Sequence, residues 1–92
     1  MALKGVVIDP GHGGSDSGAV SGSALEKDYT LLISKYIYDR LNELGIPAYL
    51  TRDKDVTLNP NDRTNSVLKA FGNDKDVVVI SNHLNAGGVN GA

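Results

Sequence analysis

The sequence contains no cysteine among its 92 residues. Disulfide frameworks, thiolate zinc sites and cysteine nucleophiles are therefore excluded, and any metal must be held by His, Asp or Glu. An excess of basic charge is also absent, because 9 Lys and Arg stand against 11 Asp and Glu and the net charge is −2. We therefore expect no nucleic acid partner.

Long apolar runs are absent as well. No stretch approaches the roughly 20 apolar residues that a membrane-spanning helix needs, and residues 1–4 lead directly into a predicted strand rather than a signal peptide. We expect no membrane insertion and no signal peptide in this chain. Its length is below the usual domain size of about 100–150 residues, so residues 1–92 are expected to form one domain with one core.

The apolar pattern predicts three strands separated by two helices. Strands are predicted at residues 4–9, 46–50 and 77–82, where apolar and β-branched residues cluster. Helices are predicted at residues 24–44 and 60–71. The apolar stripe of the first helix has seven members at helical spacing, which are Tyr29, Leu32, Ile33, Tyr36, Ile37, Leu41 and Leu44.

Both predicted helices begin with capping signals. Residues 23–26 have the form of a capping box, in which the side chains of Ser23 and Glu26 satisfy free N–H groups at the helix start. The second helix follows Asn59, and Pro60 occupies its first position.

The order β-α-β-α-β is typical of an α/β fold with a parallel sheet and right-handed crossovers. Pro47 cannot donate a backbone hydrogen bond, so the second strand is expected at a sheet edge. The strand order becomes 2-1-3, with the helices on the faces of the sheet. Ligands of open α/β sheets bind beyond the carboxyl ends of the strands, at the point where the order reverses.

The two histidines both lie at strand ends. His12 follows the first strand and His83 follows the third. Because a helix after a parallel strand starts at the same sheet edge, Glu26 is expected there too. Catalytic zinc commonly keeps three such ligands and leaves a fourth position for water. The topology therefore favours a metal site of His12, Glu26 and His83 over three unrelated roles as a loop histidine, a capping glutamate and a strand-end histidine.

The sequence favours one nucleophile but does not identify a general base. No serine lies in a nucleophile-elbow pattern, so a metal-activated water is the simpler nucleophile. No carboxylate is a convincing general base, and the candidates are Asp9, Asp16 and Asp28. Asp9 is also placed to orient a ligating imidazole, although an Asp before proline is an ordinary strand terminator.

The glycine-rich loop at residues 11–18 is not a nucleotide-binding motif. It lacks the Gly-Lys-Ser/Thr ending of a phosphate-binding loop, and Asp16 stands where a dinucleotide fingerprint starting at Gly11 requires its third glycine. We interpret Gly13 and Gly14 as positions where the backbone approaches a metal-bound substrate, and the alternative is flexible loop.

Two arginines are candidates for binding a substrate carboxylate or phosphate. They are Arg52 and Arg63. The favoured interpretation is that they form ion pairs with Asp53, Asp55 or Asp62.

Several of these segments together resemble a known family. They are residues 7–14, 26–28, 51–53, 59–63 and 83–86, and they occur in the family's order. They are similar to the zinc-dependent N-acetylmuramoyl-L-alanine amidases, which are bacterial and phage cell-wall hydrolases that include autolysins and endolysins. The resemblance runs from about residue 4 to the end of the chain.

The resemblance implies that His12, Glu26 and His83 bind Zn²⁺. It implies hydrolysis of the amide between the lactyl group of N-acetylmuramic acid and L-alanine in peptidoglycan. The place of action would be the bacterial cell wall, either outside the cell or after release from the cytoplasm as an endolysin. The candidate substrate contacts are Gly13, Gly14, Arg52 and Asn85.

In this family the sheet continues beyond the His-x-Asn-Ala motif, and a glutamate near the end of the domain acts as general acid/base. That glutamate is expected beyond Ala92, so we interpret the chain as the N-terminal half of the domain, with little activity alone. The unpaired edge of the third strand would favour self-association. The alternative function is a muropeptide- or phosphate-binding module, with or without metal.

Overall fold

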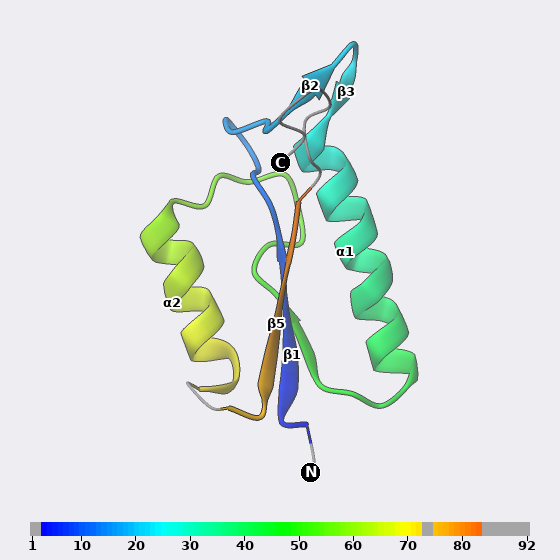
Figure 1. Ribbon diagram of the computed structural model, residues 1–92, viewed down its shortest axis with the longest axis vertical. Helices are drawn as coiled ribbons and strands as arrows, with labels where there is room; N and C mark the ends of the chain where they lie inside the picture. Colours follow the sequence, from blue (N-terminus) through cyan, green and yellow to red (C-terminus); the bar gives the residue numbers. More distant parts are fainter. Residues whose placement is uncertain (1–2, 73–74, 84–92) are drawn as a thin grey trace.

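The computed structural model describes residues 3–72 and 75–83. A central sheet contains three parallel strands in the order β4-β1-β5, which are β4 (Ala48–Leu50), β1 (Gly5–Pro10) and β5 (Val77–Asn82). The helices α1 (Glu26–Glu43) and α2 (Pro60–Phe71) lie on opposite faces of this sheet (Figure 1). The predicted α/β class, strand order and helix placement are confirmed.

Strand β1 is the buried centre of the fold. All six of its residues are buried, and Val7 and Ile8 have no exposed surface. It pairs with β4 on one side and with β5 along its full length on the other. A β-branched apolar run fits this environment, because it is covered on both faces and paired at both edges. Strand β1 therefore gives the loop after Pro10 a rigid base.

The strand that follows Pro47 lies at an edge of the sheet, as its missing N–H predicted. Strand β4 is shorter than the predicted strand and begins at Ala48. Pro47 contributes its carbonyl, which accepts a hydrogen bond from the N–H of Val6 at 2.9 Å.

The start of α1 differs from the prediction. Strands β2 (Val20–Ser21) and β3 (Ala24–Leu25) form a small antiparallel hairpin, and Ser23 lies in its turn. The N-cap of α1 is Leu25, which makes no side-chain capping hydrogen bond. The predicted capping box is therefore wrong, because pairing with β2 draws residues 24–25 into a strand and the helix begins two residues later.

Helix α1 packs on the sheet through small polar residues. Its buried residues are Glu26, Thr30 and Ser34. The side-chain amide of Asn82 in β5 donates to the carbonyl of Thr30 at 3.4 Å and to the hydroxyl of Ser34 at 3.2 Å. Five members of the predicted apolar stripe are instead exposed, namely Tyr29, Leu32, Ile33, Tyr36 and Leu44. The apolar spacing therefore predicted the helix but not the face that packs. No described helix is both long and apolar enough to cross a membrane.

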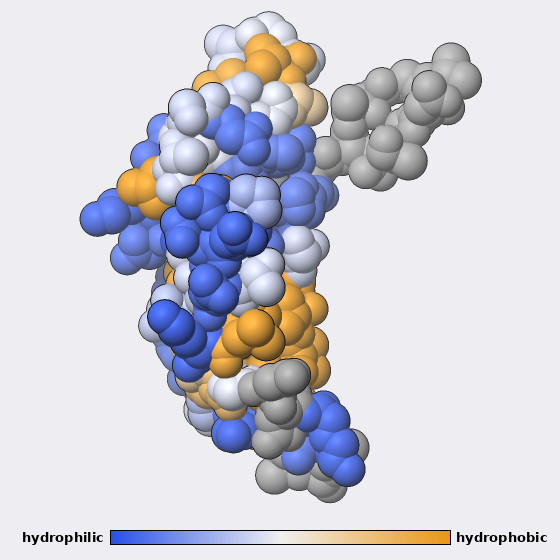
Figure 2. Space-filling view, turned by 90° about the vertical axis from the view of Figure 1, so that its left-hand side faces the viewer, coloured by the Kyte–Doolittle hydropathy of each residue, from blue (hydrophilic) through white to orange (hydrophobic). Residues whose placement is uncertain are grey.

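Strand β5 forms the other edge of the sheet, and this edge is apolar. Val78, Val79 and Ile80 are exposed by 44%, 47% and 37%. Figure 2 shows apolar surface gathered on the lower part of one side of the molecule. An exposed apolar edge strand is a template for pairing with another chain. Self-association through β5 stays a prediction.

Candidate metal centre

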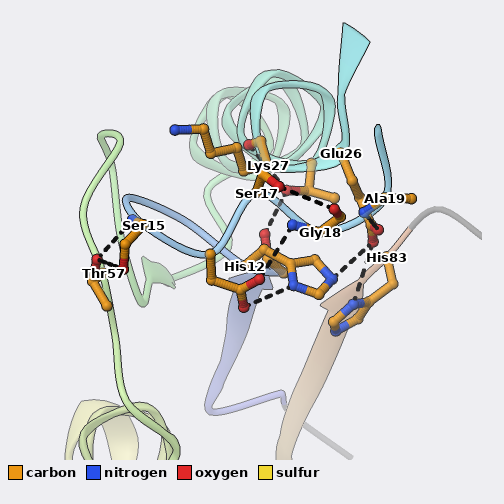
Figure 3. Close-up of polar contacts among 12 residues, drawn as sticks. His12, Ser15, Ser17, Gly18, Ala19, Glu26, Lys27, Thr57 and His83 are labelled. Atoms are coloured by element: carbon orange, nitrogen blue, oxygen red, sulfur yellow. Dashed lines mark hydrogen bonds and ion pairs between the residues drawn. The ribbon is translucent and has the colours of Figure 1, made fainter. Parts of the chain in front are cut away.

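Three potential metal ligands meet beyond the carboxyl ends of β1 and β5. His12 lies in the loop after β1, Glu26 is the first residue of α1, and His83 follows β5 (Figure 3). One ligand atom from each residue lies within 4.8 Å of the other two. The structure thus brings together the three residues that the topology placed at one sheet edge.

Glu26 occupies the middle of this cluster. Its side chain is 5% exposed, and its Oε2 lies 3.2 Å from Nε2 of His12 and 3.6 Å from Nδ1 of His83. Its other carboxylate oxygen, Oε1, accepts a hydrogen bond from the N–H of Ala19 at 2.9 Å. This hydrogen bond orients the carboxylate so that Oε2 faces both imidazoles.

His12 adopts a backbone conformation that is unfavourable for a side-chain-bearing residue. Its φ is +62°, in the left-handed region, which costs about 1–3 kcal/mol for residues other than glycine. The surrounding loop therefore has to enforce this conformation.

Asp16 orients the ring of His12. The Oδ2 atom of Asp16 lies 2.9 Å from Nδ1 of His12, on the far side of the ring from Glu26. An Nδ1–H that donates to Asp16 leaves the Nε2 lone pair for a metal, as in metal sites where a carboxylate holds the ligating histidine. The hydrogen bond with His12 also holds the pKa of the Asp16 carboxyl below its ordinary value.

Asp9, the predicted orienting residue, lies beneath the site and points toward α2. It is 6% exposed and accepts hydrogen bonds from the hydroxyl of Thr51 at 2.7 Å, from Arg63 at 2.5 Å and from the hydroxyl of Ser81 at 3.3 Å. The expectation that Asp9 orients an imidazole is therefore wrong, because its carboxylate is directed to these three groups.

Gly13 and Gly14 pack against the connection between β4 and α2. A Cβ atom at Gly13 would overlap the carbonyl oxygen of Val56, and one at Gly14 would overlap the side chain of Thr57. Both glycines also have positive φ. Close packing therefore explains why glycine is needed here, and contact of this loop with substrate remains a proposal. Asn85 lies outside the described residues.

Gly18 was not singled out in the sequence, yet it lies directly against the cluster. A Cβ atom there would be 2.6 Å from Cδ2 of His12 and 2.8 Å from Oε1 of Glu26. Gly22 provides a matched control, since its φ of +61° is close to the +69° of Gly18 and nothing lies within 4 Å of its Cβ position.

We predict that Gly18→Ala weakens metal binding far more than Gly22→Ala does. Both variants pay the same backbone penalty for positive φ, but only the first displaces His12 and Glu26. Competition with a chromophoric chelator measures the two affinities. Equal metal affinity in the two variants would contradict the placement of Gly18.

Asp55 anchors the glycine loop from the outside. Its carboxylate accepts from the N–H of Gly14 at 2.7 Å and from the ammonium of Lys27 at 2.8 Å. Lys27 also donates to the carbonyl of Gly14 at 2.9 Å. The hydrogen bond from Lys27 holds the pKa of Asp55 below its ordinary value of 3.8.

We expect the free energy of unfolding of Asp55→Asn to decrease less steeply at acid pH than that of the unaltered chain. A carboxyl with a lowered pKa in the folded state stabilises that state above its unfolded pKa, and the stabilisation is lost as pH falls through the folded pKa. For Asp55 the loss of stability begins near pH 3.8 and continues as the pH falls further. Denaturant unfolding across this range measures the slope, and Asp53→Asn at an exposed position is the control. If the free energy of unfolding of Asp55→Asn depended on pH as steeply as that of the unaltered chain, Asp55 would not be a source of the stability lost in acid.

Arg52 lies beneath the site and is 3% exposed. Its Nη2 donates to the carbonyls of Gly11 at 2.8 Å and Lys27 at 3.0 Å, and its Nη1 donates to the carbonyl of Lys54 at 3.1 Å. Burial lowers the pKa of the Arg52 guanidinium. Within the part of the chain that the structure describes, Arg52 thus donates to backbone carbonyls and to the hydroxyl of Thr30.

Arg63 also binds the loop that carries His12. It pairs with Asp9 and donates to the carbonyls of Pro10 at 2.8 Å and His12 at 3.1 Å. The predicted ion-pair partners were wrong, because Asp55 pairs with Lys27 and the Asp62 carboxylate accepts from Asn59.

A hollow of about 480 Å³ lies between α1 and β4, and its lining includes Tyr38, Tyr49 and Asp53. None of the three clustered ligands lines it. A large pocket is the usual first hypothesis for a site, but here the chemistry of the donor atoms is the stronger signal.

The donor set fits zinc. Two imidazole nitrogens and one carboxylate oxygen are a common ligand set for catalytic zinc, with a fourth position left open. Glu26 supports this fit, because its buried carboxylate presents Oε2 to one nitrogen of each histidine, at 3.2 and 3.6 Å.

Comparison with known proteins identifies one family. Residues 6–92 match the family model described as N-acetylmuramoyl-L-alanine amidase. The germination-specific N-acetylmuramoyl-L-alanine amidase of Bacillus subtilis is 37% identical over 96 residues, which cover 94% of this chain and 40% of that protein. The chain thus spans about two-fifths of the length of this relative and of a second curated protein from the same organism.

Solved structures give the same result. The catalytic domain of CwlV, an N-acetylmuramoyl-L-alanine amidase from Bacillus (Paenibacillus) polymyxa var. colistinus, matches with a TM-score of 0.82 and 32% identity over 98% of this chain and 50% of that one. The N-acetylmuramoyl-L-alanine amidase AmiC2 of Nostoc punctiforme matches with a TM-score of 0.79 and 39% identity over 91% of this chain and 45% of that one.

Proposed function

Because the chain belongs to the N-acetylmuramoyl-L-alanine amidase family, we propose that it is the metal-binding part of a zinc-dependent peptidoglycan amidase. The proposed ligands are His12, Glu26 and His83. The observation that carries the proposal is the buried carboxylate of Glu26, whose Oε2 faces a nitrogen of each histidine at 3.2 and 3.6 Å. Residues 1–92 are proposed to belong to a single catalytic domain.

The proposed reaction is hydrolysis of the amide that joins the lactyl group of N-acetylmuramic acid to L-alanine, at the bacterial cell wall. Zinc in this position would act as a Lewis acid that polarises the amide carbonyl and lowers the pKa of water to about 7. Asp16 would retain the Nδ1 proton of His12, so that Nε2 presents its lone pair. The N–H of Ala19 would hold Glu26 in the orientation that faces both rings.

The leaving L-alanine amine needs a proton. We assign that step to the glutamate that the family resemblance implies beyond Ala92, and not to Asp9 or Asp16. Asp9 is buried against Arg63, and Asp16 is engaged with His12.

A muropeptide- or phosphate-binding module without catalysis is not favoured. Arg52, the candidate cation for binding its ligand, is buried and donates to carbonyls of this chain.

A chimera tests the proposed function. In it, this chain replaces the matching half of the CwlV catalytic domain, with which it shares 32% identity. We expect the chimera to release new amino-terminal L-alanine from purified bacterial walls without new reducing sugar ends. Chelation should abolish the release and added zinc should restore it. Release that persists after complete removal of metal, or new reducing ends in place of L-alanine amino groups, would refute the proposal.

A further inference from the structure

Arg52 and Thr30 connect the segments that carry two of the proposed ligands, and we call this pair the Arg52–Thr30 strut. We propose that the strut is a positioning device that sets the separation of His12 and Glu26. The inference rests on the proposed metal centre, because it concerns the arrangement of its ligands.

A single nitrogen of Arg52 contacts both segments. Its Nη2 donates to the carbonyl of Gly11, the residue before His12, at 2.8 Å. The same atom donates to the carbonyl of Lys27, the residue after Glu26, at 3.0 Å. The guanidinium of Arg52 therefore fixes the distance between the backbone segment that carries His12 and the one that carries Glu26.

Thr30 completes the connection from the helix side. Its side chain has no exposed surface, and its hydroxyl donates to the carbonyl of Gly11 at 2.8 Å and accepts from Nη2 of Arg52 at 3.3 Å. The third ligand segment joins here as well, since the N–H of Gly11 donates to the carbonyl of Asn82 at 2.9 Å and the Asn82 amide donates to the carbonyl of Thr30. His83 follows Asn82 directly.

The burial of Arg52 favours a positioning role over simple packing. A cation that is 3% exposed pays a desolvation cost, and its neighbours on this side are carbonyl and hydroxyl oxygens rather than a paired carboxylate. An apolar side chain would fill the same volume without that cost. The second nitrogen of the guanidinium, Nη1, donates to the carbonyl of Lys54 at 3.1 Å and so fixes the direction of Nη2, and a lysine ammonium with its single nitrogen does not reproduce this pair of donors.

Two variants of the full chain test the strut. Thr30→Val keeps the shape of the side chain and removes its hydroxyl, and Arg52→Lys keeps the charge and removes the pair of nitrogen donors. Arg40→Lys at an exposed position of α1 is the control for the arginine change. Ile8→Val, a core change expected to cost about 0.5–1.5 kcal/mol, is the control for lost stability alone.

The readouts are zinc affinity by chelator competition and the visible absorption of the Co²⁺-loaded chain, which reports ligand geometry. We expect each strut variant to bind zinc about 10–100-fold more weakly and to shift the Co²⁺ bands, while both controls retain the affinity and spectrum of the unaltered chain. Strut variants with unchanged affinity and unchanged Co²⁺ bands would overturn the inference. If Arg52→Lys does not fold, Thr30→Val decides the question. Failure of the unaltered chain to bind metal would instead overturn the metal centre, and the strut with it.

Discussion

Replacing Glu26 with glutamine is expected to abolish stoichiometric zinc binding by the purified chain. Glutamine has the same shape, and its carbonyl oxygen can still accept the hydrogen bond from Ala19. The negative charge that faces His12 and His83 is lost, however, and two neutral imidazoles alone are a poor site for Zn²⁺. We expect a loss larger than the roughly 10–100-fold that follows changes around a metal site rather than in it.

Zinc content after equilibrium dialysis, measured by mass spectrometry, checks this expectation. Glu43→Gln is the matched control, since Glu43 ends the same helix, is exposed and pairs with Arg40. The unaltered chain and the control should each retain about one zinc. A full complement of zinc in Glu26→Gln would remove Glu26 from the ligand set.

Replacing Asp9 with asparagine is expected to lower the free energy of unfolding by about 3 kcal/mol. Breaking a buried ion pair from one side costs about 3–5 kcal/mol, because the other charge is left uncompensated. We expect the lower end of this range, since the Arg63 side chain is 20% exposed and keeps some hydration. The hydroxyls of Thr51 and Ser81 also lose their charged acceptor.

Denaturant unfolding measures the effect, with Asp53→Asn at an exposed position as the control, for which a change within about 0.5 kcal/mol is expected. The Arg63→Met background provides a further test. Asp9→Asn should cost clearly less there, because no guanidinium is left unpaired. An equal cost in both backgrounds would show that the pair is not the source of the stability.

The strand order of the fold could be predicted because it depends on features that sequence records directly. Strand β1 carries a β-branched apolar run at residues 6–8, and Pro47, directly before β4, restricts that strand to an edge. The capping box at residues 23–26 failed because hairpin pairing between β2 and β3 overrode a local motif. The prediction of the packing face of α1 was wrong because the helix contacts β5 through Thr30 and Ser34, whose small polar side chains do not contribute to an apolar pattern.

The candidate ligands could be predicted from the sequence for the same reason as the fold. Parallel topology sends the ends of β1 and β5 and the start of α1 to one edge, whatever the details of the loops. Contacts made by loop residues could not be predicted, because they depend on the backbone conformation of the loop, which the spacing of residues in the sequence does not encode. The contact of Asp16 with His12 forms across two glycines with positive φ, and Gly18 has nearly the same φ as Gly22 but differs from it in the atoms near its Cβ position.

X-ray absorption at the zinc edge of the purified, zinc-loaded chain tests the central claim most directly. If His12, Glu26 and His83 hold the metal, one zinc per chain should show two imidazole ligands and oxygen ligands at about 2.0–2.2 Å, with one imidazole lost in His83→Ala. A spectrum without imidazole scattering, or one that is unchanged in His83→Ala, would contradict the account.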